Sequence, residues 1–267
     1  SGPIKLFAEM QVVGATNVTL DLRGPIDTMS GTGESLYGAM KGALWLTGTN
    51  NNTLTYLMLT DGQLHLAKAP GVRGVGLELY AYDYAGSVPE VHVDAPDQLV
   101  GTPFVRLDGA KLFLHDYPTR LNSFVANEDF VYVYCGTNPG SSLTLSNSGG
   151  YPCSFYGEFN GTLVKQDPDI ATFSGLFQNG DLIVEKGLFD STLVGGPWHT
   201  VVSAGAIVRS VPPNFFNFGA LSGSGTVHIA GNYNWVGGGI SPVINSTFTG
   251  TILGTNTGAT LLKTGPS

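Results

Sequence analysis

The sequence predicts an all-β protein, and three observations support this fold class. A short phrase recurs along the chain in which apolar residues alternate with small or polar ones, and glycine stands where a strand would turn. The chain of 267 residues contains 38 glycines, and charged residues make up only 12 % of it, about half of the usual share. No window has helical periodicity over a sufficient length. Together these features favour short strands joined by tight turns.

The recurring phrase occurs four times, and two of its copies set a spacing. The copies begin at Leu36, Phe155, Phe173 and Phe248. The second and third start about 18 residues apart, close to the length of a solenoid unit. In such an array each unit buries its apolar face only against its neighbours. The middle copies therefore predict stacked coils, whereas the outer two lie too far away to fix a period.

Several stretches carry a family resemblance. Residues 63–72 read QLHLAKAPGV, residues 97–99 read DQL and residues 105–112 read VRLDGAKL. Residues 218–227 read FGALSGSGTV, and residues 262–265 read LKTG. In this order the stretches resemble the passenger-associated transport repeats, also called autotransporter-associated β-strand repeats. The resemblance covers most of the chain, but the aromatic Phe130, Tyr132 and Tyr134 depart from it, and no counterpart of the family's translocator barrel occurs in these residues.

The resemblance implies a right-handed, single-stranded parallel β-helix, which we expect to form one domain over residues 1–267. With about 22 residues per coil the chain would make about 12 coils, and the rod would be roughly 58 Å long. The competing architecture is a pair of β-sandwiches. Four dipeptides suit either a hairpin or a solenoid corner: Asp61-Gly62, Asp108-Gly109, Asn160-Gly161 and Asn179-Gly180.

The two ends of the sequence suggest self-association. Residues 261–267 followed by residues 1–9 read LLKTGPS-SGPIKLFAE, which continues the phrasing of the family. Neither end resembles a polar cap, and bare solenoid ends recruit other chains. The hypothesis is that the unit stacks head to tail, or is one block of a longer array, because such heterologous contacts give open filaments. The alternative is a fragment that lacks its caps.

The two cysteines, Cys135 and Cys153, are separated by about one repeat. Residues one coil apart in a β-solenoid stack at about 4.8 Å, which a disulfide tolerates. We therefore expect a Cys135–Cys153 disulfide and an oxidising compartment. Two independent buried thiols are the alternative.

Charge and motifs argue against several classes of partner. The net charge is −8, and the basic residues are scattered singly, so we expect no nucleic-acid partner. The sequence contains no uninterrupted apolar run of the length needed to cross a bilayer, so we expect no membrane insertion by this segment. The HExxH, P-loop and EF-hand patterns are also missing from the sequence, and we expect no cofactor and no metal.

Candidate catalytic groups are scattered, and we expect no active site. Glycoside hydrolysis needs two carboxylates about 5–9.5 Å apart. The pairs Asp167 with Asp169 and Asp94 with Asp97 each flank a proline in an expected turn, where aspartates usually bond their own backbone. We expect His115 in a turn as well. The histidines are dispersed along the sequence at His65, His92, His115, His199 and His228.

Surface chemistry points to glycans. Four sequons make candidate glycosylation sites, at Asn17, Asn51, Asn160 and Asn245. Asp83 lies between Tyr82 and Tyr84, a combination that suits a sugar. Rows of alternating aromatics occupy one face of a strand, and the sequence leaves open whether that face is core or surface.

We therefore expect a non-enzymatic extracellular or cell-surface structural protein. It would be a β-helical rod that acts as a filament subunit or an adhesin-like stalk, with end-to-end self-association and surface glycans as its partners. The alternatives are a carbohydrate-active β-helix enzyme, such as a polysaccharide lyase, hydrolase or tailspike-like depolymerase, and a carbohydrate-binding module without turnover.

Overall fold

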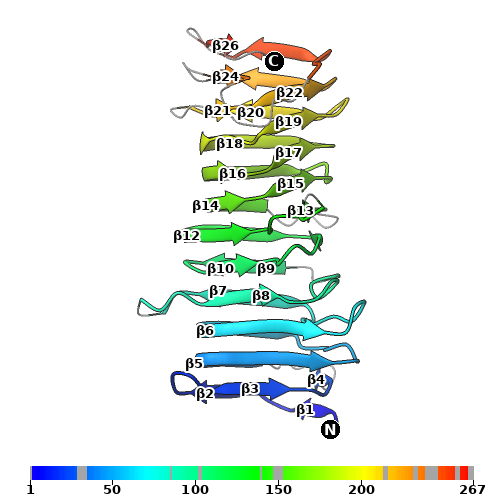
Figure 1. The fold of residues 1–267 in the computed structure, drawn as a ribbon, viewed down its shortest axis with the longest axis vertical. Coiled ribbons are helices and arrows are strands. Elements are labelled where there is room, and N and C mark those ends of the chain that lie inside the picture. Colours follow the sequence, from blue (N-terminus) through cyan, green and yellow to red (C-terminus); the bar gives the residue numbers. More distant parts are fainter. Residues whose placement is uncertain are drawn as a thin grey trace.

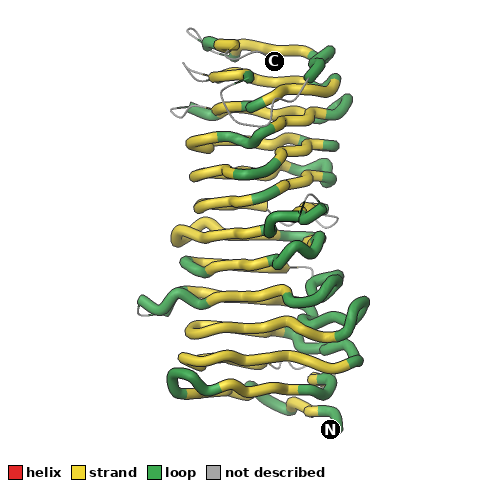
Figure 2. The backbone as a smooth tube through the Cα atoms, viewed as in Figure 1, coloured by secondary structure: helices red, strands yellow, loops and turns green. Residues whose placement is uncertain are grey.

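The computed structural model is a β-solenoid in which parallel strands stack in about 10 turns (Figure 1). It describes residues 2–28, 35–84, 86–101, 104–138, 140–146, 153–212, 216–230, 234–237, 246–255 and 259–263. These residues contain strands, turns and loops but no helix (Figure 2). The predicted all-β solenoid is confirmed, with fewer turns than expected. None of the described segments is a helix of the length and apolarity needed to span a bilayer.

The strands form a long ladder on one face of the solenoid and shorter ladders beside it. A 15-stranded sheet runs from β2 and β3 through β5 to β25, and a six-stranded sheet is ordered β11-β13-β15-β17-β19-β22. Two small sheets pair β1 with β4 and order β21-β24-β26. The strands are β1 (Ile4–Leu6), β2 (Met10–Gly14), β3 (Thr19–Leu22), β4 (Ile26–Thr28), β5 (Ser35–Gly48), β6 (Tyr56–Lys68), β7 (Glu78–Tyr82), β8 (Glu90–Val93), β9 (Phe104–Asp108), β10 (Lys111–Phe113), β11 (Thr119–Leu121), β12 (Phe124–Tyr134), β13 (Ser142–Leu145), β14 (Cys153–Asn160), β15 (Thr162–Lys165), β16 (Ile170–Gln178), β17 (Asp181–Val184), β18 (Leu188–Gly195), β19 (His199–Val202), β20 (Ile207–Ser210), β21 (Phe216–Asn217), β22 (Ala220–Gly223), β23 (Thr226–Ile229), β24 (Asn234–Val236), β25 (Thr251–Gly254) and β26 (Leu261–Lys263).

Parallel pairing decides between the two architectures. Every pairing between the named strands of the described chain is parallel. A sandwich built from hairpins would pair antiparallel instead. The Asn-Gly dipeptides at 160–161 and 179–180 lie at the corners from β14 to β15 and from β16 to β17. They turn the chain between the faces of a coil, as in the solenoid interpretation.

The coils differ in length, which is why no single period describes the chain. Phe155 lies opposite Phe173, so the two middle copies of the recurring phrase do stack as predicted, across a short coil. By contrast, Leu79 lies opposite Val105, and the coil between them is clearly longer. Longer coils carry extra loop residues outside the ladder (Figure 2), and a loop on the surface adds length at little cost in stability.

The core is a column of side chains from successive coils. Alternate residues point inward, as the buried-intermediate alternation of β7, β8 and β17 shows. Phe124, Phe155, Phe173 and Phe189 are all buried, and consecutive rings in this column lie 6.1, 5.1 and 5.1 Å apart. Each ring buries its faces against the coils above and below it. The core is therefore continuous along the axis of the solenoid.

Glycine is required at one column position within the ladder. Gly157 and Gly175 lie opposite each other in the register, with φ of 155° and 110°. A Cβ on Gly157 would lie 1.9 Å from the carbonyl oxygen of Val131, and one on Gly175 would lie 2.0 Å from that of Gly157. Contacts this short are impossible, so the recurring glycine of the phrase lets adjacent coils approach.

Two lysines are buried inside the solenoid, where charged side chains are rare unless paired. Lys165 and Asp167 form an ion pair with fully buried side chains, and Lys165 Nζ lies 3.2 Å from Asp167 Oδ1. Lys68 Nζ donates to the carbonyl of Thr47 at 3.2 Å. Burial lowers the pKa of both lysines. Their ammonium groups donate to backbone carbonyls at or just beyond the ends of strands.

The expected disulfide is wrong. Cys135 and Cys153 are both free and buried. Cys153 begins β14 at the level of Phe124, whereas Cys135 follows the end of β12 and lies beside Gly161. The cysteines thus lie at opposite ends of the paired strands β12 and β14. At about 3.3 Å per residue they are roughly 25 Å apart. The expectation failed because the coil at this level is longer than the spacing between the two cysteines. Burial raises the pKa of the Cys135 thiol to about 12 and that of Cys153 to about 11.

Candidate functional site

A column of stacked rings lies on the outer side of the long sheet. Trp45, His65, His92, Phe113 and Tyr134 occupy equivalent positions in β5, β6, β8, β10 and β12. Consecutive ring centroids lie 4.0, 4.5, 4.8 and 5.0 Å apart, and the rings are within 10° of parallel. These residues alternate with buried leucines and valines on the same strands, so the column faces outward. We call it the ring column.

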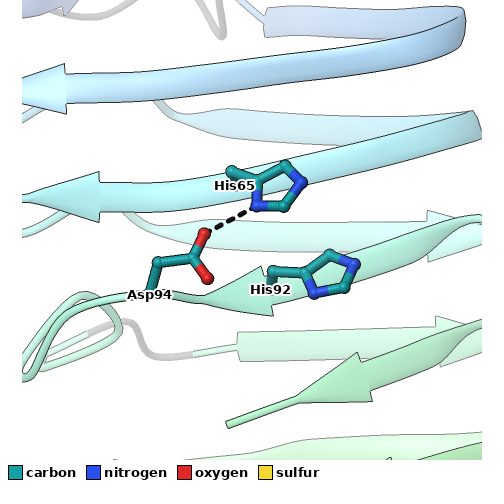
Figure 3. Close-up of side chains that lie close together, drawn as sticks. All are labelled: His65, His92 and Asp94. Atoms are coloured by element: carbon teal, nitrogen blue, oxygen red, sulfur yellow. Dashed lines mark hydrogen bonds and ion pairs between the residues drawn. The ribbon is translucent and has the colours of Figure 1, made fainter. Parts of the chain in front are cut away.

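Four polar side chains cluster at the middle of the ring column. Asp94 directly follows β8 and, like His92 on that strand, points outward. Its carboxylate reaches across to the preceding coil, where Asp94 Oδ2 lies 2.6 Å from His65 Nδ1 (Figure 3). His115, just after β10, adds a third ring from the following coil. We call His65, His92, Asp94 and His115 the histidine cluster.

The donor atoms of the histidine cluster converge. His92 Nδ1 lies 2.8 Å from His115 Nε2, and His115 Nε2 lies 3.6 Å from Asp94 Oδ1. One ligand atom from each of His65, His92 and Asp94 lies within 4.8 Å of the others. The side chains of His65 and His92 are 13 % and 12 % exposed, Asp94 is 23 % exposed and His115 is 43 % exposed. The cluster is therefore most open to small solutes on the His115 side.

Backbone geometry places His115 in the cluster. His115 and Asp116 have φ of 47° and 68°, in the left-handed region that histidine and aspartate tolerate better than most residues. The Tyr117 amide donates to the Leu114 carbonyl at 3.0 Å, which closes the turn. The expectation of a turn at His115 is confirmed. The turn lifts its ring out of the Phe113 position and stacks it on His92, 5.1 Å away.

Burial and neighbouring groups shift the pKa of two members of the cluster, His92 and Asp94. Burial lowers the pKa of His92, and His65 and His115 lower it further. Burial alone would raise the pKa of Asp94, but the hydrogen bond and charge of His65 outweigh it, and the net pKa is lowered. Asp94 is therefore a carboxylate, while burial and the neighbouring imidazoles disfavour protonation of His92.

A carboxylate also lies on the far side of the His92 ring. Glu90 Oε2 lies 3.5 Å from His92 Nε2, and Glu90 is held by Lys111 at 2.9 Å and by Gln63 at 2.9 Å. His92 Nε2 is buried, with no hydrogen-bond partner among the described residues. Glu90 is thus placed to favour the tautomer of His92 that carries its proton on Nε2. In that tautomer Nδ1 carries no proton, so its lone pair can bind a metal ion.

The cluster corrects the expectation that the histidines are dispersed. The register brings His65, His92 and His115 together although each comes from a different coil. His199 and His228 lie elsewhere, on β19 and β23. No signal in the sequence indicated the cluster, because its members come from coils of unequal length.

The expected turn pair Asp94 and Asp97 is confirmed only in part. Asp97 has a turn φ of 64° and its carbonyl accepts the Val100 amide at 3.2 Å. Asp94 instead directs its carboxylate to His65 on the preceding coil. The partner of Asp94 lies across the ladder and not in its own turn, so the local interpretation missed it.

The other candidate carboxylates have structural partners. Asp167 is buried against Lys165 and accepts the Asp169 amide at 2.9 Å, which confirms that this Asp-Pro-Asp segment forms a turn. Asp83 accepts the Gly86 amide at 2.8 Å in another turn. Tyr80 and Tyr82 stack at 4.8 Å on the outer side of β7, so this row of aromatics belongs to the surface.

A groove of about 550 Å³ lies along the corners that join the two main sheets. Its walls come from the ends of β14 and β16 and from the starts of β15 and β17. The groove is lined by Gly136, Thr137, Asn138, Ser141, Asn160, Gly161, Thr162, Asn179, Gly180, Asp181 and Trp198. Burial raises the pKa of Asp181. Amides, a carboxylate and an indole ring together can bind a polyhydroxylated ligand.

The candidate glycosylation sites differ in exposure. Asn17 and Asn51 are exposed, Asn17 in a turn with φ of 65°. Asn160 is half-buried at the groove. Asn245 lies outside the described residues. Glycosylation stays a prediction for all four, with Asn17 and Asn51 the most accessible of the described sites.

Comparison with protein-family models, with curated proteins and with solved structures gives no match in any of the three.

Proposed function

We propose that this chain is a non-enzymatic structural rod of the extracellular surface, which acts as a filament subunit or an adhesin-like stalk. The observation that carries the proposal is the continuous parallel ladder with its column of stacked core rings. A solenoid of this kind transmits load through hydrogen bonds and core contacts that repeat in every turn. The resemblance to autotransporter-associated repeats supports the same role.

The two end turns of the described chain support end-to-end stacking with a second copy. At one end β2 and β3 pair only with β5, and at the other β25 pairs only with β23. Apolar side chains are exposed at both ends: Phe7 and Val13 are each 71 % exposed, and Ile252 is 43 % exposed. A parallel edge of this kind accepts another parallel strand. Because the two edges differ, the contact would be heterologous and would form an open filament.

Electron microscopy of the purified chain at near-physiological salt tests this proposal. About 10 turns at roughly 4.8 Å per turn give a repeat of roughly 48 Å along each filament. We expect uniform fibres, with a mass per length of one chain per repeat. Val13→Lys places a charge on the end edge and should shorten or abolish the fibres.

The matched control is Val88→Lys, at an exposed valine (42 %) in the loop between β7 and β8, on the side of the solenoid. It should leave the fibres unchanged. Isolated short rods at all concentrations, or equal effects of both substitutions, would contradict self-stacking as the basis of function.

Carbohydrate recognition is a second candidate, and the groove beside Trp198 favours it. Asn138, Asn160 and Asn179 present amides and Asp181 presents a carboxylate along its walls. Only one carboxylate lines this groove in the described chain, whereas hydrolysis normally uses two. The groove therefore favours binding over turnover.

A glycan array followed by titration calorimetry tests the second candidate. A ligand whose affinity falls at least tenfold in Trp198→Ala, but not in Trp45→Phe on another part of the surface, would support it. Release of reducing sugar by the unmodified chain would instead favour the enzymatic alternative. No binding to any glycan would remove carbohydrate recognition and leave the structural proposal intact.

A further inference from the structure

The histidine cluster has the composition of a transition-metal site. It offers three imidazole nitrogens and one carboxylate, from His65, His92, His115 and Asp94. Imidazole and carboxylate are common ligands of Zn²⁺, and structural zinc sites use four protein ligands in a tetrahedron. The set is not an acidic surface patch, because it has one carboxylate and its two innermost rings are nearly buried.

The distances also fit. In a tetrahedron with metal–ligand bonds of about 2.0–2.1 Å, neighbouring donor atoms lie about 3.3 Å apart. The observed separations are 2.6 Å from His65 Nδ1 to Asp94 Oδ2, 2.8 Å from His92 Nδ1 to His115 Nε2 and 3.6 Å from His115 Nε2 to Asp94 Oδ1. Ligand atoms of His65, His92 and Asp94 lie within 4.8 Å of one another, so the side chains have to move closer together before all the donors reach coordination distance.

The surroundings restrict how the ligands can move. The His65 and His92 rings are stacked at 4.5 Å in the ring column, with Trp45 behind His65 and Phe113 behind His92. The rings are nearly parallel, and a metal ion lies in the plane of an imidazole that binds it, so one of the two innermost rings has to turn out of the stack when the ion binds. Glu90 Oε2 lies 3.5 Å from His92 Nε2 without a hydrogen bond to it, on the side where an outer carboxylate often orients a metal-binding histidine. His115, the most exposed member, leaves a path for the ion to enter.

We propose that His65, His92, His115 and Asp94 form a binding site for a tetrahedral divalent metal ion, with Zn²⁺ as the preferred occupant. The ligands come from three successive coils, on β6, at β8 and after β10. The ion thus cross-links three turns of the solenoid at its surface. This inference is independent of the proposed function, because a metal-linked solenoid could serve as a rod or as a binding module.

Isothermal titration calorimetry of the metal-free chain with ZnCl₂, together with melting curves with and without zinc, tests the proposal. We expect one zinc ion per chain. When free zinc is 100-fold above its dissociation constant, the melting temperature should rise by roughly 5–11 °C. Co²⁺ in place of Zn²⁺ should give the visible absorption of a tetrahedral site.

Two variants probe the ligands without breaking the ring column. His65→Phe keeps a stacking ring, as Phe113 does in the same column, and Asp94→Asn keeps the shape of the carboxylate. Each should weaken zinc binding at least tenfold while the far-ultraviolet circular dichroism stays unchanged. The matched control His228→Gln, on β23 away from the cluster, should bind zinc as the unmodified chain does.

The inference would be overturned by no zinc binding by the unmodified chain, by equal affinity in Asp94→Asn, or by an octahedral Co²⁺ spectrum. A loss of binding in His228→Gln equal to that in His65→Phe would also overturn it, because scattered surface histidines would then account for the binding.

Discussion

Replacement of Lys165 by methionine tests whether the buried ion pair holds the coils together. Methionine keeps most of the volume of the lysine side chain but removes the ammonium group. That group donates to the Asp167 carbonyl at 2.7 Å, to the Lys186 carbonyl at 3.1 Å and to Asp167 Oδ1 at 3.2 Å. The variant leaves the Asp167 carboxylate buried, with the Asp169 amide as the donor that remains to it among the described residues.

The expected loss of unfolding free energy follows from that geometry. Breaking a buried pair by removing one partner costs about 3–5 kcal/mol, because the other charge stays uncompensated. At roughly 2–4 °C per kcal/mol for a chain of this size, the melting temperature should fall by about 6–20 °C. Urea unfolding followed by circular dichroism measures the change.

A double-mutant cycle separates the ion pair from packing. Asp167→Asn removes the charge that Lys165→Met leaves behind, so the double variant should be more stable than the sum of the single losses predicts, by more than about 1 kcal/mol. Lys186→Met, at an exposed lysine of the next corner, is the control and should change stability by less than about 0.5 kcal/mol. Additive single effects, or a Lys165→Met loss as small as that of the control, would refute the reasoning.

Three further predictions concern the core, the recurring glycine and the thiols. Phe173→Ala, in the middle of the phenylalanine column, should cost about 3–5 kcal/mol in unfolding experiments, whereas Phe130→Ala, at a 38 % exposed ring, should cost about 1 kcal/mol or less. Gly157→Ala places a Cβ against a backbone carbonyl of the neighbouring coil and should either prevent accumulation of folded protein or lower its melting temperature by more than about 10 °C; a normal melting curve would contradict the close approach. Burial raises the pKa of Cys135 to about 12 and that of Cys153 to about 11. A thiol reagent at mildly alkaline pH should therefore label neither cysteine in the folded chain and both in urea. Because both thiols are free, a reducing agent should not change the stability of the chain.

Local pattern was sufficient to predict the fold class. The alternation of apolar and small residues and the spacing between Phe155 and Phe173 predicted stacked strands, and those two rings do stack. This succeeds because strand alternation and glycine at a close approach are requirements of each coil by itself. The paired carboxylates at Asp167 and Asp169 were also correctly interpreted as a turn, since an aspartate beside proline has local backbone partners.

The histidine cluster and the positions of the cysteines needed the register between coils. His65 meets His92 across a long coil, while Phe155 meets Phe173 across a much shorter one. The expected Cys135–Cys153 bridge failed for the same reason, since the separation in sequence did not equal the length of the coil between them.

The sequence by itself thus determined that the chain forms strands and that the strands stack, but it left open which face of the aromatic-bearing strands points inward. Only the tertiary structure decided which outward side chains share a column, because loops of different length add residues to a coil without moving its strands. The number of residues in each loop sets the sequence separation between side chains that are neighbours on adjacent coils. Because that number differs from coil to coil, the sequence does not show which outward side chains meet.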